Sequence, residues 1–207
     1  PEVNQPEVGR LVVTLYEWLI RAVAGDPSKV QIMYGLAGER RLPELELDWL
    51  SGFAGSRPVR IGNGAADQLQ IDVFGEVMDA MHHARLNGME PDVEAWHIQT
   101  VMLDWLEGNW RLPDEGIWEV RGGRAQFTYS KLMAWVAFDR GIRAVDRYPL
   151  SGDTELWKAR RSEIHAEICS EAVDERGVFT QSYGSSLLDA STLMIPLVGF
   201  LPASDPR

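Results

Sequence analysis

The chain has 207 residues, of which 45% are hydrophobic and 25% charged, so it holds enough apolar side chain to form a folded core. Its formal net charge of −11 argues against a nucleic-acid partner, because an acidic surface repels phosphates. No apolar run approaches the roughly 20 residues of a membrane span, and the single cysteine, Cys169, excludes an internal disulfide and a cysteine-built zinc site. With no secretory signal visible, we expect a cytoplasmic protein.

Along most of the chain, apolar residues recur at spacings of three and four, which is typical of helices with a buried face. Gly, Asn and Pro residues interrupt this pattern and indicate where helices end. We expect Thr154 to cap the fifth helix and Pro196 to end the sixth. The predicted helices cover Arg10–Ala24, Ala66–Leu86, Asp92–Glu107, Thr128–Asp146, Thr154–Ser170 and Ser186–Ile195.

Long, glycine-containing loops separate these helices at Gln31–Ala65, Gly108–Phe127 and Glu171–Ser185. Loops of this length inside a domain are usually functional. Within the second loop, the alternation in Ile117–Arg121, followed by two glycines, predicts one strand of a hairpin. The repeated order of helix, long loop and helix predicts an all-α fold whose helical hairpins stack or close into a ring. Six such helices would make half of an (α/α)6 toroid.

Tryptophan is used heavily, at 8 positions. Four of these residues lie at helical spacing and are expected in the core: Trp96, Trp105, Trp135 and Trp157. Three others lie in loops beside Gly, Pro and acidic residues: Trp49, Trp110 and Trp118. Indoles near carboxylates suit a carbohydrate, because a sugar ring stacks on the indole while the acids accept hydrogen bonds from its hydroxyl groups. Alternatively, each loop tryptophan simply packs its own loop against the protein.

Glu119 is the main candidate for acid–base chemistry. Ile117, Trp118 and Val120 surround it with apolar surface, and desolvation raises the pKa of a carboxyl group toward the range of a general acid. Arg121 would oppose this effect if it reached the carboxylate, since both would share one face of a strand. An ordinary surface pair of Glu119 and Arg121 is therefore the alternative.

The loop Gly55–Gln68 leads into the second predicted helix. It lacks the spacing of a phosphate-binding loop, and Asp67 adds negative charge at its end. Arg60 and Asn63 could instead donate hydrogen bonds to sugar hydroxyl groups, or the loop could be a turn that uses glycines at positive φ. The histidines supply no ligand set for a metal, and we expect neither metal nor cofactor.

Several segments together resemble the bacterial branch of glycoside hydrolase family 15, which contains glucoamylases, glucodextranases and some trehalases. The match extends over nearly the whole chain in the order of the family. Its segments are Gln31–Gly35, Gly38–Arg40, Gly55–Ala65, Asp114–Arg121, Phe127–Lys131 and Pro196–Pro202.

The resemblance implies an (α/α)6 barrel that releases glucose from α-glucosides with inversion, by a glucoamylase or, as the alternative, a trehalase. It implies that Glu119 is the general acid and that Trp118 lies beside the released sugar. Arg60 and Asn63 fall on the loop that borders the sugar. The further cleft residues that it implies are Tyr34, Arg121 and Lys131.

Two parts of the family pattern have no counterpart here. The general base, a Glu in an Ala-Glu-Glu/Gln-like stretch, would follow Arg207, and a Trp-x-Arg-Asp segment would precede Pro1. Inversion needs two carboxyl groups roughly 6.5–9.5 Å apart, with water between them. We therefore expect residues 1–207 to be the middle of a catalytic domain that lacks its N- and C-terminal parts. The alternative of another class is a non-catalytic carbohydrate-binding or structural segment.

Overall fold

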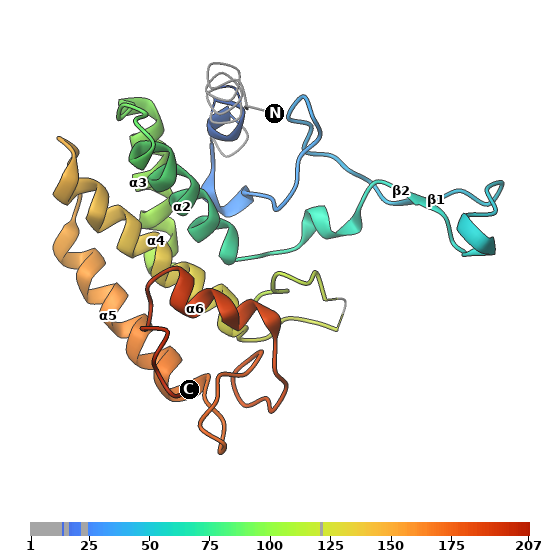
Figure 1. Ribbon diagram of the computed structural model, residues 1–207. Helices are drawn as coiled ribbons and strands as arrows, with labels where there is room; N and C mark the ends of the chain where they lie inside the picture. Colours follow the sequence, from blue (N-terminus) through green and yellow to red (C-terminus); the bar gives the residue numbers. More distant parts are fainter. Residues whose placement is uncertain (1–13, 15–16, 22–24, 121) are drawn as a thin grey trace, which may run out of the picture.

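Four long helices form the body of the protein in the computed structural model, which describes residues 14, 17–21, 25–120 and 122–207 (Figure 1). They are α2 (Asp72–Leu86), α3 (Val93–Asn109), α4 (Thr128–Arg147) and α5 (Thr154–Glu171). The described chain also contains short 3-10 segments and the single-turn helix α6 (Met194–Leu197). Most of the predicted helix Arg10–Ala24 lies outside the described residues, although residues 17–21 are helical. The all-α fold predicted from the periodicity is thus confirmed.

An arm formed by residues 42–63 extends away from the helical body (Figure 1). Within it, β1 (Leu45–Glu46) pairs antiparallel with β2 (Arg60–Ile61), so that Leu45 lies opposite Ile61. At the base of the arm the Asn63 amide donates to the Leu42 carbonyl at 3.2 Å. The 3-10 segments of this half of the chain are η1 (Pro27–Lys29), η2 (Phe53–Gly55) and η3 (Gly64–Asp67).

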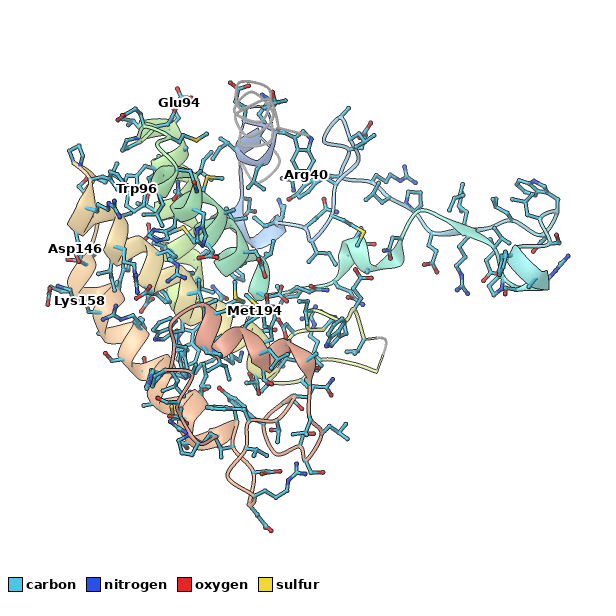
Figure 2. All side chains as sticks on the ribbon, viewed as in Figure 1. Arg40, Glu94, Trp96, Asp146, Lys158 and Met194 are labelled. Atoms are coloured by element: carbon cyan, nitrogen blue, oxygen red, sulfur yellow. The ribbon has the colours of Figure 1, made fainter. Side chains whose placement is uncertain are left out.

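Helix α4 is the centre of the fold, because nearly all of its residues are buried. Gly75 of α2 packs so closely on α4 that a Cβ atom there would lie 2.2 Å from the Met133 carbonyl oxygen. Side chains fill the space between the helices, whereas Asp146 and Lys158 lie on the outer side (Figure 2).

The charges that α4 buries are paired. Arg140 bonds Asp79 of α2 and its neighbour Asp139, each at 2.6 Å, and donates to the Val198 carbonyl at 3.2 Å. A buried charge without a partner would cost several kcal/mol, on the order of 3–5. This network therefore ties α2, α4 and the segment after α6 together.

Helices α3, α4 and α5 begin and end within two residues of the prediction. The second predicted helix is shorter than Ala66–Leu86, because residues 68–70 have no helical structure and Ile71 is only the cap residue before α2. Asp153, not Thr154, caps α5, since its Oδ1 accepts from the Leu156 amide at 3.0 Å.

The sixth predicted helix, Ser186–Ile195, is also corrected. The segment forms η4 (Ala190–Leu193) followed by α6, and Pro196 lies inside α6 instead of ending it. Proline is tolerated in the first turn of a helix, where its missing N–H would have no intrahelical partner.

Candidate active site

The loop between α3 and α4 carries Trp118 and Glu119. Residues 116–119 form a turn, in which the Glu119 amide donates to the Gly116 carbonyl at 3.1 Å. The predicted strand at Ile117–Arg121 is therefore wrong, although the loop is closed as a hairpin by a bridge between Asp114 and Ala125. Glu119 has a φ of 52°, in the left-handed region that residues other than glycine rarely adopt. Such backbone persists where its surroundings hold it, often at functional sites.

Two residues distant in the sequence hold this turn. The Trp118 indole is 56% exposed, and its Nε1 donates to Asp189 Oδ2 at 2.7 Å. Asp189 also accepts from the Gln181 side chain and from the Ser191 amide, so its position is fixed. The Gln68 side-chain amide lies 3.5 Å from the Glu119 carbonyl oxygen.

The Glu119 carboxylate is half-buried and has no hydrogen bond or ion pair among the described residues. Arg121 lies outside the described residues, so the structure does not test the alternative of a Glu119–Arg121 pair. The turn thus combines an exposed indole with a carboxyl group whose oxygens the described chain does not use. This combination can bind a sugar face and exchange a proton.

The base of the loop is fastened by buried polar groups. Asp114 Oδ2 accepts from the Ile71 amide at 2.8 Å, and the Asp114 amide and carbonyl pair with Ala125 at 3.0 and 2.9 Å. Lys131 Nζ donates to the carbonyls of Trp110 and Leu112, both at 2.7 Å. The start of the loop is therefore held to α4 and to the residue before α2.

Burial dominates the electrostatics under the loop. It raises the pKa of Asp114 and lowers the pKa of Lys131 to about 8. The opposite charges of these two side chains partly offset the effect of burial on each other's pKa. Burial, together with the nearby Asp114 and Glu76 carboxylates, raises the pKa of Asp72 to about 7. Of these groups, Asp114 belongs to the loop, Asp72 is the first residue of α2 and Lys131 lies in the first turn of α4.

The other predicted site residues lie in different surroundings. Arg60 lies on β2 of the arm and pairs with Glu46 at 2.9 Å and Glu44 at 3.4 Å. Asn63 caps η3, since its Oδ1 accepts from the Ala65 amide at 2.9 Å. No hydrogen bond or ion pair within the described residues joins either of them to Glu119.

Tyr34 and Lys131 are engaged inside the fold. The Tyr34 hydroxyl accepts from the Gln31 amide at 2.9 Å, and its ring packs edge-on against Trp18. Lys131 is 0% exposed, so its amine does not line an open cleft, which differs from the expectation. Among the loop tryptophans, Trp110 is also buried, so that it packs its loop and does not face solvent.

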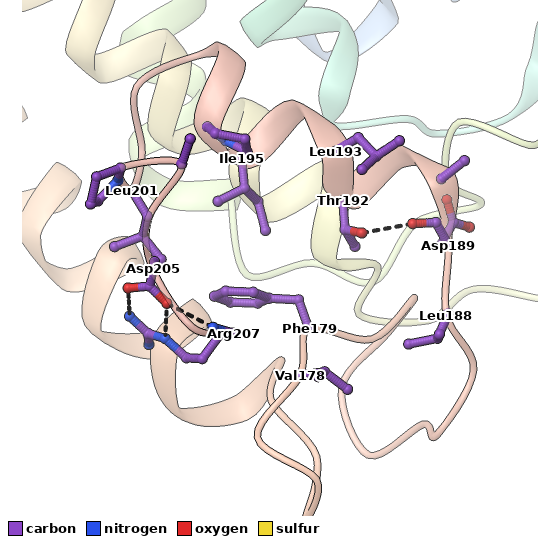
Figure 3. A pocket seen from close by; sticks show the side chains of 14 residues that line it. Val178, Phe179, Leu188, Asp189, Thr192, Leu193, Ile195, Leu201, Asp205 and Arg207 are labelled. Atoms are coloured by element: carbon purple, nitrogen blue, oxygen red, sulfur yellow. Dashed lines mark hydrogen bonds and ion pairs between the residues drawn. The ribbon is translucent and has the colours of Figure 1, made fainter.

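Two hollows flank the loop. A hollow of about 650 Å³ lies beside Gln68, Leu69, Trp105 and Arg124, and it borders the turn through Gln68. A second hollow, of about 550 Å³, has Asp189 on its rim and mostly apolar walls (Figure 3). In the second hollow the Asp205 carboxylate pairs with Arg207 at 2.8 Å.

In the described part of the chain, no group of three His, Cys, Asp or Glu residues is arranged to hold a metal ion. The helices described also include none that is long and apolar enough to cross a membrane.

Solved structures that align with this chain include glycosidases. A variant glycosidase in complex with glucose aligns with a TM-score of 0.59 at 20% identity, covering 73% of this chain and 42% of that one. A second glycosidase variant aligns with a TM-score of 0.57 over the same shares. Together with the helical body described above, these alignments define the fold as that of (α/α)6-type glycosidases.

Residues 12–207 match the family model of Glycosyl hydrolases family 15, and the chain belongs to this family of glycoside hydrolases. It is 46% identical to a trehalase of Mycobacterium tuberculosis over 86% of its own length and 26% of the relative. It is 45% identical to a trehalase of Mycolicibacterium smegmatis over 88% of its own length and 27% of the relative. A trehalase of Thermoplasma acidophilum is 38% identical, over 87% of this chain and 31% of the relative. The chain thus spans about a quarter to a third of these relatives' length.

Sequence reasoning brought Trp118 and Glu119 forward, and Lys131 as a cleft residue, but missed the roles of Asp189 and Gln68. Asp114 is the first residue of the segment Asp114–Arg121 that carries the resemblance, yet nothing in its sequence neighbourhood indicates that it accepts a hydrogen bond from the Ile71 amide. Asp189 lies 71 positions from Trp118, so a single sequence carries no signal for that contact.

Proposed function

We propose that this chain is the central part of the catalytic domain of an inverting α,α-trehalase. Trehalase is favoured over a glucan-trimming glucoamylase by the names of the relatives, among them one that is 46% identical. The protein as a whole would release glucose from trehalose, and a cytoplasmic location would suit an enzyme of disaccharide metabolism. The domain limits expected above, with N- and C-terminal parts outside residues 1–207, stay part of this proposal.

In this mechanism, Glu119 is the general acid. It donates its proton to the glycosidic oxygen as the bond from that oxygen to the anomeric carbon breaks. A second carboxylate outside this chain would take a proton from water, whose oxygen attacks the opposite face of the sugar. Trp118 would stack on the released glucose. The observation that supports this assignment is the turn, which presents Glu119 beside an exposed indole held by Asp189.

The remaining site residues carry less of the proposal. Arg60, Asn63, Tyr34 and Arg121 stay predictions from the resemblance, as contacts of the sugar in the assembled cleft. We assign Lys131 to holding the loop, because its amine donates to two carbonyls of that loop.

The test uses the complete gene product, assayed for glucose release from trehalose, maltose and dextrin. We expect trehalose to be the preferred substrate. Glu119→Gln should lower kcat by about 100- to 10,000-fold, because it removes the proton donor and keeps the shape. Glu175→Gln, in an exposed turn of another loop, is the matched control and should leave the rate unchanged.

Two results would contradict the proposal. A Glu119→Gln variant with a wild-type rate would remove this residue from the mechanism and favour a non-catalytic role. Preferred hydrolysis of dextrin would favour the glucoamylase. Proton NMR of the freshly released glucose distinguishes inversion from retention. With inversion, we expect each trehalose molecule cleaved to give one β-anomer and one α-anomer.

A further inference from the structure

Asp114 is the residue through which the base of the Glu119 loop is joined to α2. Its carboxylate accepts from the Ile71 amide, directly before α2 begins, at 2.8 Å. Its backbone amide and carbonyl both pair with Ala125 on the returning side of the loop. The next residue, Glu115, donates its amide to the Leu69 carbonyl at 3.1 Å. Both sides of the loop are therefore closed at residue 114, five positions before Glu119.

The chemistry of Asp114 is unusual for a residue that serves packing alone. It is 0% exposed, and its carboxyl group lies among the Ile71 amide, the Ser130 hydroxyl and the Lys131 amine, all of which favour its charged form. Burying a carboxyl group is unfavourable, because its charged form loses its hydration. What the side chain supplies in return is a directed hydrogen bond to the backbone of the residue before α2. Such a bond fixes the position of a loop more narrowly than apolar contact does, because it is directional.

We propose that Asp114 is a positioning residue for Glu119. By holding the loop to the Ile71 amide, its carboxylate makes the turn present the Glu119 side chain at one place relative to the glycosidic oxygen. This inference rests on the proposed function, since it requires Glu119 to be the proton donor. A displacement of about 1 Å at a reacting group can cost about 100-fold in rate.

The test compares two substrates of the complete gene product. In trehalose the leaving oxygen must receive a proton, whereas in α-glucosyl fluoride the leaving fluoride ion needs far less protonation. Asp114→Ala removes the acceptor for the Ile71 amide and should lower kcat on trehalose by about 100-fold, with kcat on the fluoride changed by less than about threefold. Asp114→Asn keeps an oxygen that can accept the same hydrogen bond, and it should retain trehalose kcat within about fivefold.

The outcomes separate this inference from the proposed function. Equal losses on both substrates, or an unchanged rate on trehalose in Asp114→Ala, would overturn the positioning role. A Glu119→Gln variant that still cleaves trehalose at the wild-type rate would overturn the proposed function itself, whatever Asp114 does. If circular dichroism shows that Asp114→Ala does not fold, Asp114→Asn decides: retained trehalose turnover supports the inference, and equal loss on both substrates refutes it.

Discussion

Replacing Asp72 by Asn should stabilise the protein in a strongly pH-dependent way. Asp72 is the first residue of α2 and is buried, its Oδ2 has no hydrogen-bond partner in the described chain, and its neighbours include the carboxylates of Asp114 and Glu76. Burial first, and these charges second, raise its pKa from an ordinary 3.8 to about 7. Asn has the same shape and carries no charge, so the variant removes the cost of ionisation and little else.

The sign follows from proton binding. Between pH 3.8 and about 7 the folded protein holds a proton on Asp72 that the unfolded chain has released, so the free energy of unfolding falls as the pH rises. Each unit of pKa difference corresponds to about 1.4 kcal/mol, so ionisation of Asp72 lowers the free energy of unfolding by about 4 kcal/mol above pH 7. About 3 kcal/mol of this loss of stability occurs between pH 5 and pH 8.

The assay is urea unfolding followed by tryptophan fluorescence, at pH 5 and pH 8. The stability gained by Asp72→Asn over the wild type should be larger at pH 8 by about 3 kcal/mol. Asp104→Asn, at an exposed position of α3, is the matched control and should show no such difference. If the wild type and Asp72→Asn depend on pH in the same way, the carboxyl group is already ionised at pH 5 and the reasoning is refuted.

Two further predictions concern the helices and are measured by the same unfolding assay. Gly75→Ala should destabilise the protein by about 3 kcal/mol, because the new Cβ atom would clash with the Met133 carbonyl. Gly108→Ala has open space around it and should stabilise the protein by about 0.5–1 kcal/mol. Equal effects of the two substitutions would contradict the close packing of α2 on α4. Asp153→Ala should lower stability by about 1 kcal/mol, because the Leu156 amide loses its acceptor, and an unchanged unfolding midpoint would show that this cap contributes nothing.

The body of the fold could be predicted because its helices have regular apolar spacing. Residues 128–147 show this most clearly, and the observed α4 agrees with the prediction to one residue. Short segments were harder, since Trp118 and Val120 alternate with Glu119 and Arg121 as they would in a strand, yet residues 116–119 form a turn. What distinguishes the two is the positive φ of Gly116 and Glu119, which a bulky residue such as glutamate does not signal in a sequence.

The candidate site likewise has a part that could be predicted from the sequence and a part that could not. The neighbours Trp118 and Glu119 could be singled out because one short segment contains both, but their partners come from elsewhere in the chain. Asp189 reaches Trp118 only because the segment before α6 folds back over the loop, and Lys131 reaches Trp110 through the packing of α4. Contacts of this kind depend on tertiary structure, which local periodicity does not encode.

Asp114 and Lys131 both form hydrogen bonds with main-chain atoms of their partners, and this determines which substitutions the loop region tolerates. A carbonyl or amide is present whatever side chain stands at positions 71, 110 and 112, except that proline would remove the amide at 71. The anchoring of the loop therefore requires the side chains of Asp114 and Lys131, but it does not require particular side chains at the positions they bond. The side chains at positions 71, 110 and 112 can therefore change while the loop that carries Trp118 and Glu119 stays attached at the same points.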